Sequence, residues 1–295
     1  MIDAERLLAW SFPEIEHSYS QRDTMLYALA LGIGRNPCDP QALRFVEDTA
    51  APLLALPTMA VVIGFPGSWM QDPATGIDFA RIVHGEEELL LHHPLPAAAI
   101  VIARHKVVKV VDKGPGRGAT ITYDKDLFLR DGGTHLATVR HTTFARGDGG
   151  FSGVPVPQSA TPTVAFNLPD RAPDDIAVVL GLPQQALLYR LCGDRNPLHS
   201  DPATARAAGF DRPILHGLCT FGMAADVLLS QWAGGDPARL ASLRARFSKP
   251  VFPGETLLIE SWREGREIQF RVLVRERDAV VLNQGYATLN EELVR

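Results

Sequence analysis

The stretch "GLCTFGMAADVLLSQWAGG", residues 217–235, decides the fold of the C-terminal half. Large or apolar residues recur in it at helical spacing: Leu218, Phe221, Ala225, Leu228 and Trp232. Gly234 and Gly235 end the run. Small and apolar residues lie on nearly every side, so the stretch predicts a helix that is buried all round.

Four strand-like runs follow this helix: "RARFSKPVF" (244–252), "TLLIESWRE" (256–264), "EIQFRVLVRER" (267–277) and "VVLNQGYATL" (280–289). In the third run Phe270 and Val272 alternate with Arg271, which is the period of a strand with one buried face. A buried helix followed by a long antiparallel sheet predicts an α+β domain whose sheet wraps the helix.

The N-terminal half repeats this order, which indicates an internal duplication. Three pairs of stretches match in the same sequence: 25–43 with 187–205, 53–64 with 212–222, and 79–91 with 246–260. The strands expected in the N-terminal half are 98–113, 118–130 and 135–146. Glycine, proline, serine and threonine fill 145–165, which is typical of a linker. We therefore predict an N-terminal domain 1–148, a linker 149–164 and a C-terminal domain 165–295.

The loop "GDRNPLH", 193–199, carries the candidate chemistry. It follows a predicted helix over 184–192 that ends at Gly193, a candidate left-handed cap. Pro197 disfavours helical geometry at Asn196, so the loop is a fixed turn that can aim Asp194 and His199 at one water. Asn196 adds an amide that can bind the same water.

A purely structural role is the alternative for this loop, because Asp-x-Asn-Pro is good turn chemistry by itself. The duplicate loop at 34–39 keeps Arg-Asn-Pro but lacks the acid and the imidazole. This difference favours chemistry in the C-terminal half alone, with a degenerate, non-catalytic N-terminal half.

Gly217 stands at the entry to the buried helix, in "PILHGLC" (213–219). The first N–H groups of a helix have no internal partner, and glycine lets a ligand approach the backbone closely. Such an N–H could stabilise an enolate oxygen formed from a thioester. A glycine needed only for helix packing is the alternative.

Composition bounds the partners and the compartment. A net charge of −5 disfavours nucleic acid and anionic membranes as partners. The N-terminus lacks the pattern of a signal peptide, and no apolar stretch reaches the length of a membrane span. Cys38, Cys192 and Cys219 form no C-x-x-C pair, which indicates reduced thiols and a cytoplasmic protein. His92 and His93 lack partners at zinc-like spacing, so we expect no metal site.

"YRLCGDRNPLHSDPATARAAGF" (189–210), followed by "PILHGLCTFG" (213–222), resembles the signature of the hydratase 2 family, the MaoC-like (R)-specific enoyl-CoA hydratases. Nearly the whole chain resembles the two-domain form, the hydratase unit of peroxisomal multifunctional enzymes of type 2. The resemblance implies a double hot-dog fold, in which each half is a long helix wrapped by an antiparallel sheet.

The resemblance also implies roles for particular residues. Asp194 and His199 would be the catalytic pair, with Asn196 as a water or substrate ligand and the Gly217 N–H as the oxyanion donor. Residues expected to contact the acyl-CoA are His84, Gly85, Lys113, Arg195, Pro197, Leu198 and Phe247. Considered by themselves, Lys113 could be a solvated turn residue and Phe247 a core residue.

The expected activity is reversible hydration of trans-2-enoyl-CoA to (3R)-3-hydroxyacyl-CoA, in fatty-acid or related acyl-CoA metabolism, without a metal or redox cofactor. The degenerate half would widen a tunnel for long or branched acyl chains, and the family resemblance suggests a homodimer. Two alternatives stay open: a dehydratase of another 3-hydroxyacyl thioester, on a sterol side-chain CoA or acyl carrier protein, and a non-catalytic acyl-CoA-binding subunit. Spacing alone does not decide whether Asp194 or His199 takes the proton of the water.

Overall fold

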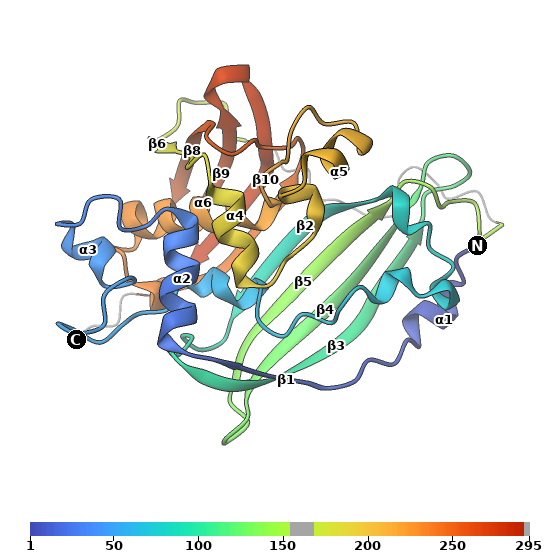
Figure 1. Cartoon of the computed structure of the whole chain (residues 1–295), viewed down its shortest axis with the longest axis horizontal. Helices are drawn as coiled ribbons and strands as arrows, with labels where there is room; N and C mark the ends of the chain where they lie inside the picture. The colour runs from blue at the N-terminus through green and yellow to red at the C-terminus, as the bar shows by residue number, and fades with distance from the viewer. Residues whose placement is uncertain (154–167, 292–295) are drawn as a thin grey trace.

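The computed structural model describes residues 1–153 and 168–291. In this part of the chain ten antiparallel strands form one continuous sheet, in the order β1-β3-β4-β5-β2-β7-β10-β9-β8-β6 (Figure 1). Their bounds are Ile15–Tyr19 (β1), Ile82–Leu91 (β2), Ala99–Asp112 (β3), Ala119–Leu129 (β4), His135–Ala145 (β5), Asp175–Leu180 (β6), Leu240–Phe247 (β7), Thr256–Glu264 (β8), Glu267–Val274 (β9) and Ala279–Leu289 (β10). The first five strands in this order come from the N-terminal half and the last five from the C-terminal half. The predicted duplication therefore appears as two sheet units that meet where β2 pairs with β7.

The C-terminal half is built as predicted around one long helix. This helix, α6, runs from Gly217 to Trp232 and ends just before Gly234 and Gly235, which adopt positive φ. It packs against β7 and β8 of its own half and against N-terminal segments. Phe221 and Leu228 are completely buried, as the apolar pattern on all sides of the helix requires.

The predicted helix over 184–192 is a shorter α-helix with a tightened end. The helix α4 covers Gln185–Tyr189, and a 3₁₀ turn, η5, covers Arg190–Cys192. Gly193 has φ 138° and ψ −41°, so the left-handed cap predicted there is wrong. Because the last turn tightens to 3₁₀ geometry, the Gly193 N–H donates to the carbonyl of Arg190 within the same turn. The chain still needs a positive φ at this point, which favours glycine.

The N-terminal half has no counterpart of α6 among its described residues, so the long helix expected there is wrong. It keeps α2 (Gln21–Leu31), but a 3₁₀ helix, η1 (Pro57–Val61), stands where the duplication predicts the long helix. Gly64 follows this short helix and packs closely against β3, because a Cβ added at Gly64 would lie 2.4 Å from the Cβ of Ala103. The buried Lys125 donates to the carbonyls of Val61 and Ile63, at 3.0 and 2.7 Å, and so closes the short helix.

Short elements cover the part of the N-terminal sheet that a long helix would occupy. They are α1 (Ala4–Leu8), η2 (Trp69–Gln71), η3 (Pro73–Thr75) and η4 (Phe79–Arg81). Side chains from α1 and η2 form a second apolar cluster with β3, β4 and β5, separate from the main core. The remaining short elements are α3 (Pro40–Leu43), η6 (Pro197–His199), α5 (Pro202–Ala207), η7 (Pro237–Arg239) and η8 (Arg275–Arg277).

The predicted linker, 149–164, lies largely outside the described residues. Its first residues are fixed to the β3–β4 turn, because the N–H groups of Gly150 and Ser152 donate to the Asp112 carboxylate at 2.7 and 2.8 Å. The domain limits 1–148 and 165–295 stay a prediction. Within 1–153 and 168–291, no helix has the length and apolar character that a bilayer crossing requires.

Candidate active site

The loop 193–199 has the bent geometry that its proline predicts. Asn196 has φ −53° and ψ 123°, and Pro197 opens η6. The Asp194 carboxylate accepts the Asn196 N–H at 3.0 Å, and the Asn196 side chain accepts the Leu198 N–H at 3.0 Å. The turn-forming role and the chemical role are therefore compatible. The same side chains that fix the turn also hold Asp194 beside His199.

His199 is buried and held in one orientation. Its Nδ1 donates to the carbonyl of Ile214 at 2.8 Å, on the segment that leads into α6. A carbonyl only accepts, so Nδ1 carries the hydrogen and Nε2 is bare in the neutral ring. Burial lowers the pKa of His199, although Ile214 and Asp194 oppose the effect. The site therefore holds a neutral imidazole with a free acceptor nitrogen.

A second histidine, His216, completes the site, although it was not among the residues predicted from the sequence. Its ring stacks on His199, with centroids 3.7 Å apart, and its Nε2 donates to the backbone carbonyl of Asp194 at 3.1 Å. Burial, with the neighbouring His199, lowers the pKa of His216 to about 4. Its place directly before Gly217 was the available signal. His216 thus ties the loop to the start of α6.

The three side chains converge. One ligand atom each from Asp194, His199 and His216 lies within 4.8 Å of the others. Two hydrogen bonds of about 2.8 Å span roughly 5.6 Å, so a single water can bridge the carboxylate and an imidazole. Asp194 is exposed and His199 is buried. A water between them would therefore face solvent on the Asp194 side and the protein interior on the His199 side.

Gly217 is the first residue of α6, and His216 is its N-cap. Within the described residues, no protein acceptor is recorded for the Gly217 N–H. An added Cβ at Gly217 would lie 2.9 Å from the ring of Phe247. Gly217 therefore fits both interpretations. Its lack of a side chain makes room for the Phe247 ring, and its position at the start of the helix leaves its N–H without a partner inside the helix.

The N-terminal half reaches this site across the seam between β2 and β7. The ring of His84, on β2, lies 4.2 Å from the ring of Phe247 at the end of β7. Gly85 sits at an irregularity in the β2–β5 register, close to the carbonyl of Thr142. His84 and His141 both donate to the buried carboxylate of Glu87, at 3.0 and 2.9 Å.

Glu87 and His141 were not among the predicted site residues. Strand alternation was a usable signal for Glu87, because it shares a strand face with the buried Leu89. His141 lies on β5, and no local pattern in the sequence connects it with β2.

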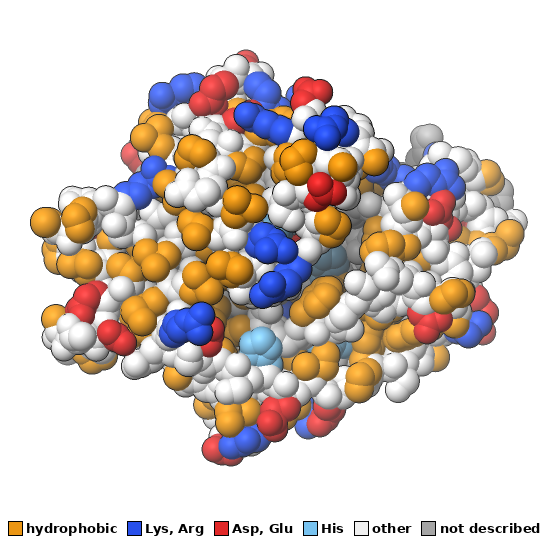
Figure 2. Space-filling view, in the orientation of Figure 1, with side chains coloured by type: hydrophobic (Ala, Val, Ile, Leu, Met, Phe, Trp, Pro, Cys, Tyr) orange, Lys and Arg blue, Asp and Glu red, His pale blue; other side chains and the backbone are white. Residues whose placement is uncertain are grey.

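The other predicted contact residues lie at the edge of the site or away from it. Arg195 and Pro197 are exposed on the loop, and Leu198 is half-buried. Lys113 is exposed in the β3–β4 turn, where its N–H donates to Gly118 at 3.0 Å. Among the described residues, no hydrogen bond or ion pair joins Lys113 to the other predicted site residues. Figure 2 shows a hollow beside the segment that carries α4, with histidine visible at depth and basic side chains at its rim.

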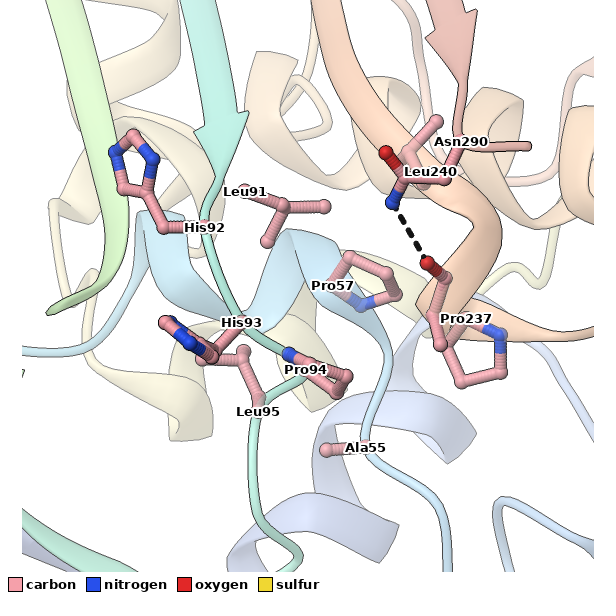
Figure 3. Close-up of a pocket in the computed structure, with 11 residues that line it drawn as sticks. Ala55, Pro57, Leu91, His92, His93, Pro94, Leu95, Pro237, Leu240 and Asn290 are labelled. Atoms are coloured by element: carbon pink, nitrogen blue, oxygen red, sulfur yellow. Dashed lines mark hydrogen bonds between the residues drawn. The ribbon is translucent and has the colours of Figure 1, made fainter. Parts of the chain in front are cut away.

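A separate pocket lies at the opposite end of the β2–β7 seam (Figure 3). Leu91 and Leu240 form its walls together with His92 and His93, and its volume is about 30 Å³. That is the volume of about one water molecule, so this pocket does not hold an acyl-CoA. The Nδ1 of His93 donates a hydrogen bond to the carbonyl of His135 at 2.8 Å.

Comparisons with known proteins agree with the division into two halves. Residues 17–147 match the MFE-2 hydratase 2 N-terminal domain, and residues 160–284 match the MaoC like domain. Enoyl-CoA hydratase ChsH3 of Mycobacterium tuberculosis is 37% identical, over 96% of this chain and 97% of that protein. Mouse peroxisomal multifunctional enzyme type 2 is 36% identical over 94% of this chain, which spans only 37% of that larger protein.

Solved structures support the same architecture. A MaoC-like dehydratase from Phytophthora capsici superposes with a TM-score of 0.83 and 32% identity, covering 98% of this chain and 99% of the other. A Mycobacterium tuberculosis protein described as a double hot-dog fold superposes with a TM-score of 0.54 over 95% of this chain and 97% of the other, at 17% identity. The α+β double hot-dog class is thereby confirmed, although only the C-terminal half keeps the long helix.

Proposed function

This chain belongs to the family that joins an MFE-2 hydratase 2 N-terminal domain to a MaoC-like domain, and we propose that it is an (R)-specific enoyl-CoA hydratase. As such a hydro-lyase it adds water to trans-2-enoyl-CoA and reverses the reaction from (3R)-3-hydroxyacyl-CoA. The observation that carries the proposal is the convergence of Asp194 and His199 within one water's reach, on the loop that His216 ties to the start of α6.

In this proposal one water supplies both new groups of the product. Asp194 accepts one hydrogen bond from the water, and the bare Nε2 of His199 takes a proton as the oxygen bonds to C3. The electrons of the double bond move to the thioester oxygen, where the Gly217 N–H stabilises the negative charge. His199 then returns its proton to C2. The tautomer fixed by Ile214 is the reason for choosing His199 as the proton acceptor.

Substitution of the pair tests the proposal. Asp194→Asn and His199→Gln should fold normally and lose about 10²-fold to 10⁴-fold in the hydration of crotonyl-CoA. Asp211→Asn, at an exposed carboxylate outside the loop, is the control and should keep the wild-type rate. Near wild-type turnover by either site variant would rule out the assignment.

The N-terminal half is proposed to bind the acyl tail. Its short η1 helix, in place of a full-length central helix, supports a wider path for long or branched chains than two complete halves would leave. The ratio of kcat/KM for C10 and branched enoyl-CoA to that for C4 should exceed one. Equal or lower values for the long substrates would reject this role.

We propose that the reaction uses no metal and no redox cofactor, because water activation is assigned to side chains alone. Dialysis against EDTA should leave the rate unchanged. Acyl-CoA is the proposed partner, and nucleic acid is not, since the net charge is −5.

A homodimer is proposed on the exposed apolar edge of the sheet. The terminal strand β6 presents Ile176, Val178 and Leu180, each at least 50% exposed, with no strand beyond it in the described sheet. Light scattering should give twice the mass of the chain. The cytoplasm is the proposed compartment, supported by the three free cysteines and open to test by cell fractionation.

A further inference from the structure

We propose that Glu87 and His141 are positioning residues for this reaction: together they fix His84 against Phe247, and Phe247 against Gly217. The inference rests on the proposed function and deepens it. It assigns to the N-terminal half a share in the geometry of the catalytic centre, besides binding of the acyl tail.

The cluster is compact, with a buried acid between two half-buried histidines. Glu87 is 2% exposed, and one oxygen of its carboxylate accepts hydrogen bonds from both His84 and His141. The two imidazole rings are in contact, tilted by 34° with centroids 3.9 Å apart. Each ring therefore has one nitrogen held by the same acid and one face held by the other ring, which leaves little freedom for His84 to turn.

A continuous line of contacts leads from this cluster to the proposed oxyanion site. The centroids of the His84 and Phe247 rings are 4.2 Å apart. The Phe247 ring in turn fills the space in which a Cβ of Gly217 would lie, at 2.9 Å. β2 and β7 are paired directly beside these residues, with Glu87 opposite Ala245. A shift of His84 would therefore move the ring that packs against Gly217, the residue that carries the proposed oxyanion N–H.

Electrostatics supports an ionised Glu87. Burial alone would raise its pKa, but the charge of His141 and hydrogen bonds from both histidines outweigh burial and lower the pKa to about 2. From β4, Lys125 and Tyr123 also face the carboxylate. The cluster thus holds its acid in the hydrogen-bond-accepting form throughout the neutral range.

The same three residues could offer ligand atoms to a metal ion. The hydrogen-bonded arrangement favours the positioning role, because both imidazole nitrogens point hydrogens at one carboxylate oxygen. Metal analysis of the purified protein separates the two: a stoichiometric metal that disappears in Glu87→Gln would overturn the proposal.

A matched control exists on the same sheet. Asp126, on β4, accepts a hydrogen bond from His135 at 3.1 Å, and the His135 ring is in tilted contact with the His92 ring, with centroids 4.1 Å apart. His135 is the first residue of β5, whereas His141 lies near the middle of that strand. Asp126→Asn therefore repeats the chemical change of Glu87→Gln without touching the line of contacts to Gly217.

The test is a double-mutant cycle on crotonyl-CoA hydration. Glu87→Gln should lower kcat by about 10-fold to 100-fold, the range typical of residues that orient a functional group, with a smaller change in KM. In a His84→Ala background the same substitution should change kcat by less than about twofold, because its effect passes through His84. Asp126→Asn should keep the wild-type kcat.

Three results would reject the proposal: an unchanged kcat in Glu87→Gln, equal losses in Glu87→Gln and Asp126→Asn, or additive effects of Glu87→Gln and His84→Ala. If Glu87→Gln does not fold, His141→Asn enters the same cycle. The ¹⁵N spectrum of His84 should change in Glu87→Gln whatever the substrate of the enzyme is. This readout separates failure of the inference from failure of the proposed function.

Discussion

At the scale of single residues, the proposed site depends on a histidine that is kept neutral. Burial lowers the pKa of His199 below its ordinary value, and the stacked His216 is itself held neutral at pH 7 by burial. Neutral His199 can accept a proton only at Nε2, because Nδ1 is committed to Ile214. The two histidines thus keep the acceptor nitrogen available down to mildly acidic pH.

This arrangement predicts the pH dependence of kcat/KM. Because the pKa of His199 is lowered from its ordinary value of 6.5, Nε2 becomes protonated only below that pH. A protonated Nε2 can no longer accept a proton from water. Activity should therefore be flat through pH 7 and fall with a midpoint below 6.5. A midpoint above 6.5 in a pH–rate profile would contradict His199 as the proton acceptor.

Gly217→Ala should separate catalysis from stability. The new methyl group would meet the Phe247 ring at 2.9 Å and push it from the site, so kcat should fall by at least about tenfold. Gly222→Ala, on the same helix, would meet Leu31 at the same distance but away from the loop. It should lower the melting temperature while keeping kcat. Equal kcat in the two variants would contradict the role of Gly217.

At the scale of elements, the short helix η1 needs another hydrogen-bond donor for the carbonyls at its C-terminal end, because no further helical turn follows. Lys125 provides it, as a buried ammonium between the carbonyls of Val61 and Ile63. Burial lowers its pKa to about 8, and the negative charge of Glu87 limits the effect, so the group remains largely charged at pH 7. A cation at the end of a helix also complements the helix dipole.

Lys125→Met should therefore destabilise the fold. The variant removes a donor from two backbone carbonyls, and the expected loss in the free energy of unfolding is about 2–4 kcal/mol. Lys109→Met, at an exposed position of β3, should change it by less than about 0.5 kcal/mol. Urea denaturation of both variants measures the difference, and equal midpoints would show that η1 does not depend on Lys125.

At the scale of the whole molecule, the two halves share one sheet. Leu89 of β2 pairs with Leu243 of β7, and both are completely buried. The halves should consequently unfold together. Trp10 and Trp69 report on the N-terminal half and Trp232 and Trp262 on the C-terminal half, so replacing either pair by phenylalanine isolates the signal of the other. The two fluorescence midpoints in urea should coincide, whereas separate midpoints would mean independent domains.

The fold followed from the sequence wherever a pattern was periodic. The helix at 217–232 and seven of the ten described strands, β3 to β5 and β7 to β10, were predictable from the sequence. The strands β1, β2 and β6 were not predicted. The reduction of the N-terminal helix to η1 was not, because the duplication argued for a full copy. The deciding contacts are Gly64 on Ala103 and Lys125 on Ile63, which join segments far apart in the chain.

The site was predictable in its local part. The loop 193–199 brings Asp194 and His199 together through hydrogen bonds within a few residues, and a proline fixes its bend. His141 belongs to the neighbourhood of His84 only through the pairing of β2 with β5, which no local pattern encodes. Lys113, which the family resemblance places in contact with the acyl-CoA, lies on an exposed turn, and this contact stays a prediction.

The pairing of β2 with β7 also limits how the two repeats can diverge. The loop of the N-terminal repeat lacks the acid and the imidazole, but its strand β2 still places His84 against Phe247, which packs on Gly217 of the other repeat. If Glu87 and His84 act as proposed, substitutions on this strand of the N-terminal repeat would affect the reaction in the other repeat. A chimera that takes each repeat from a different relative should work only when the donors agree at this strand pair, however well each repeat folds.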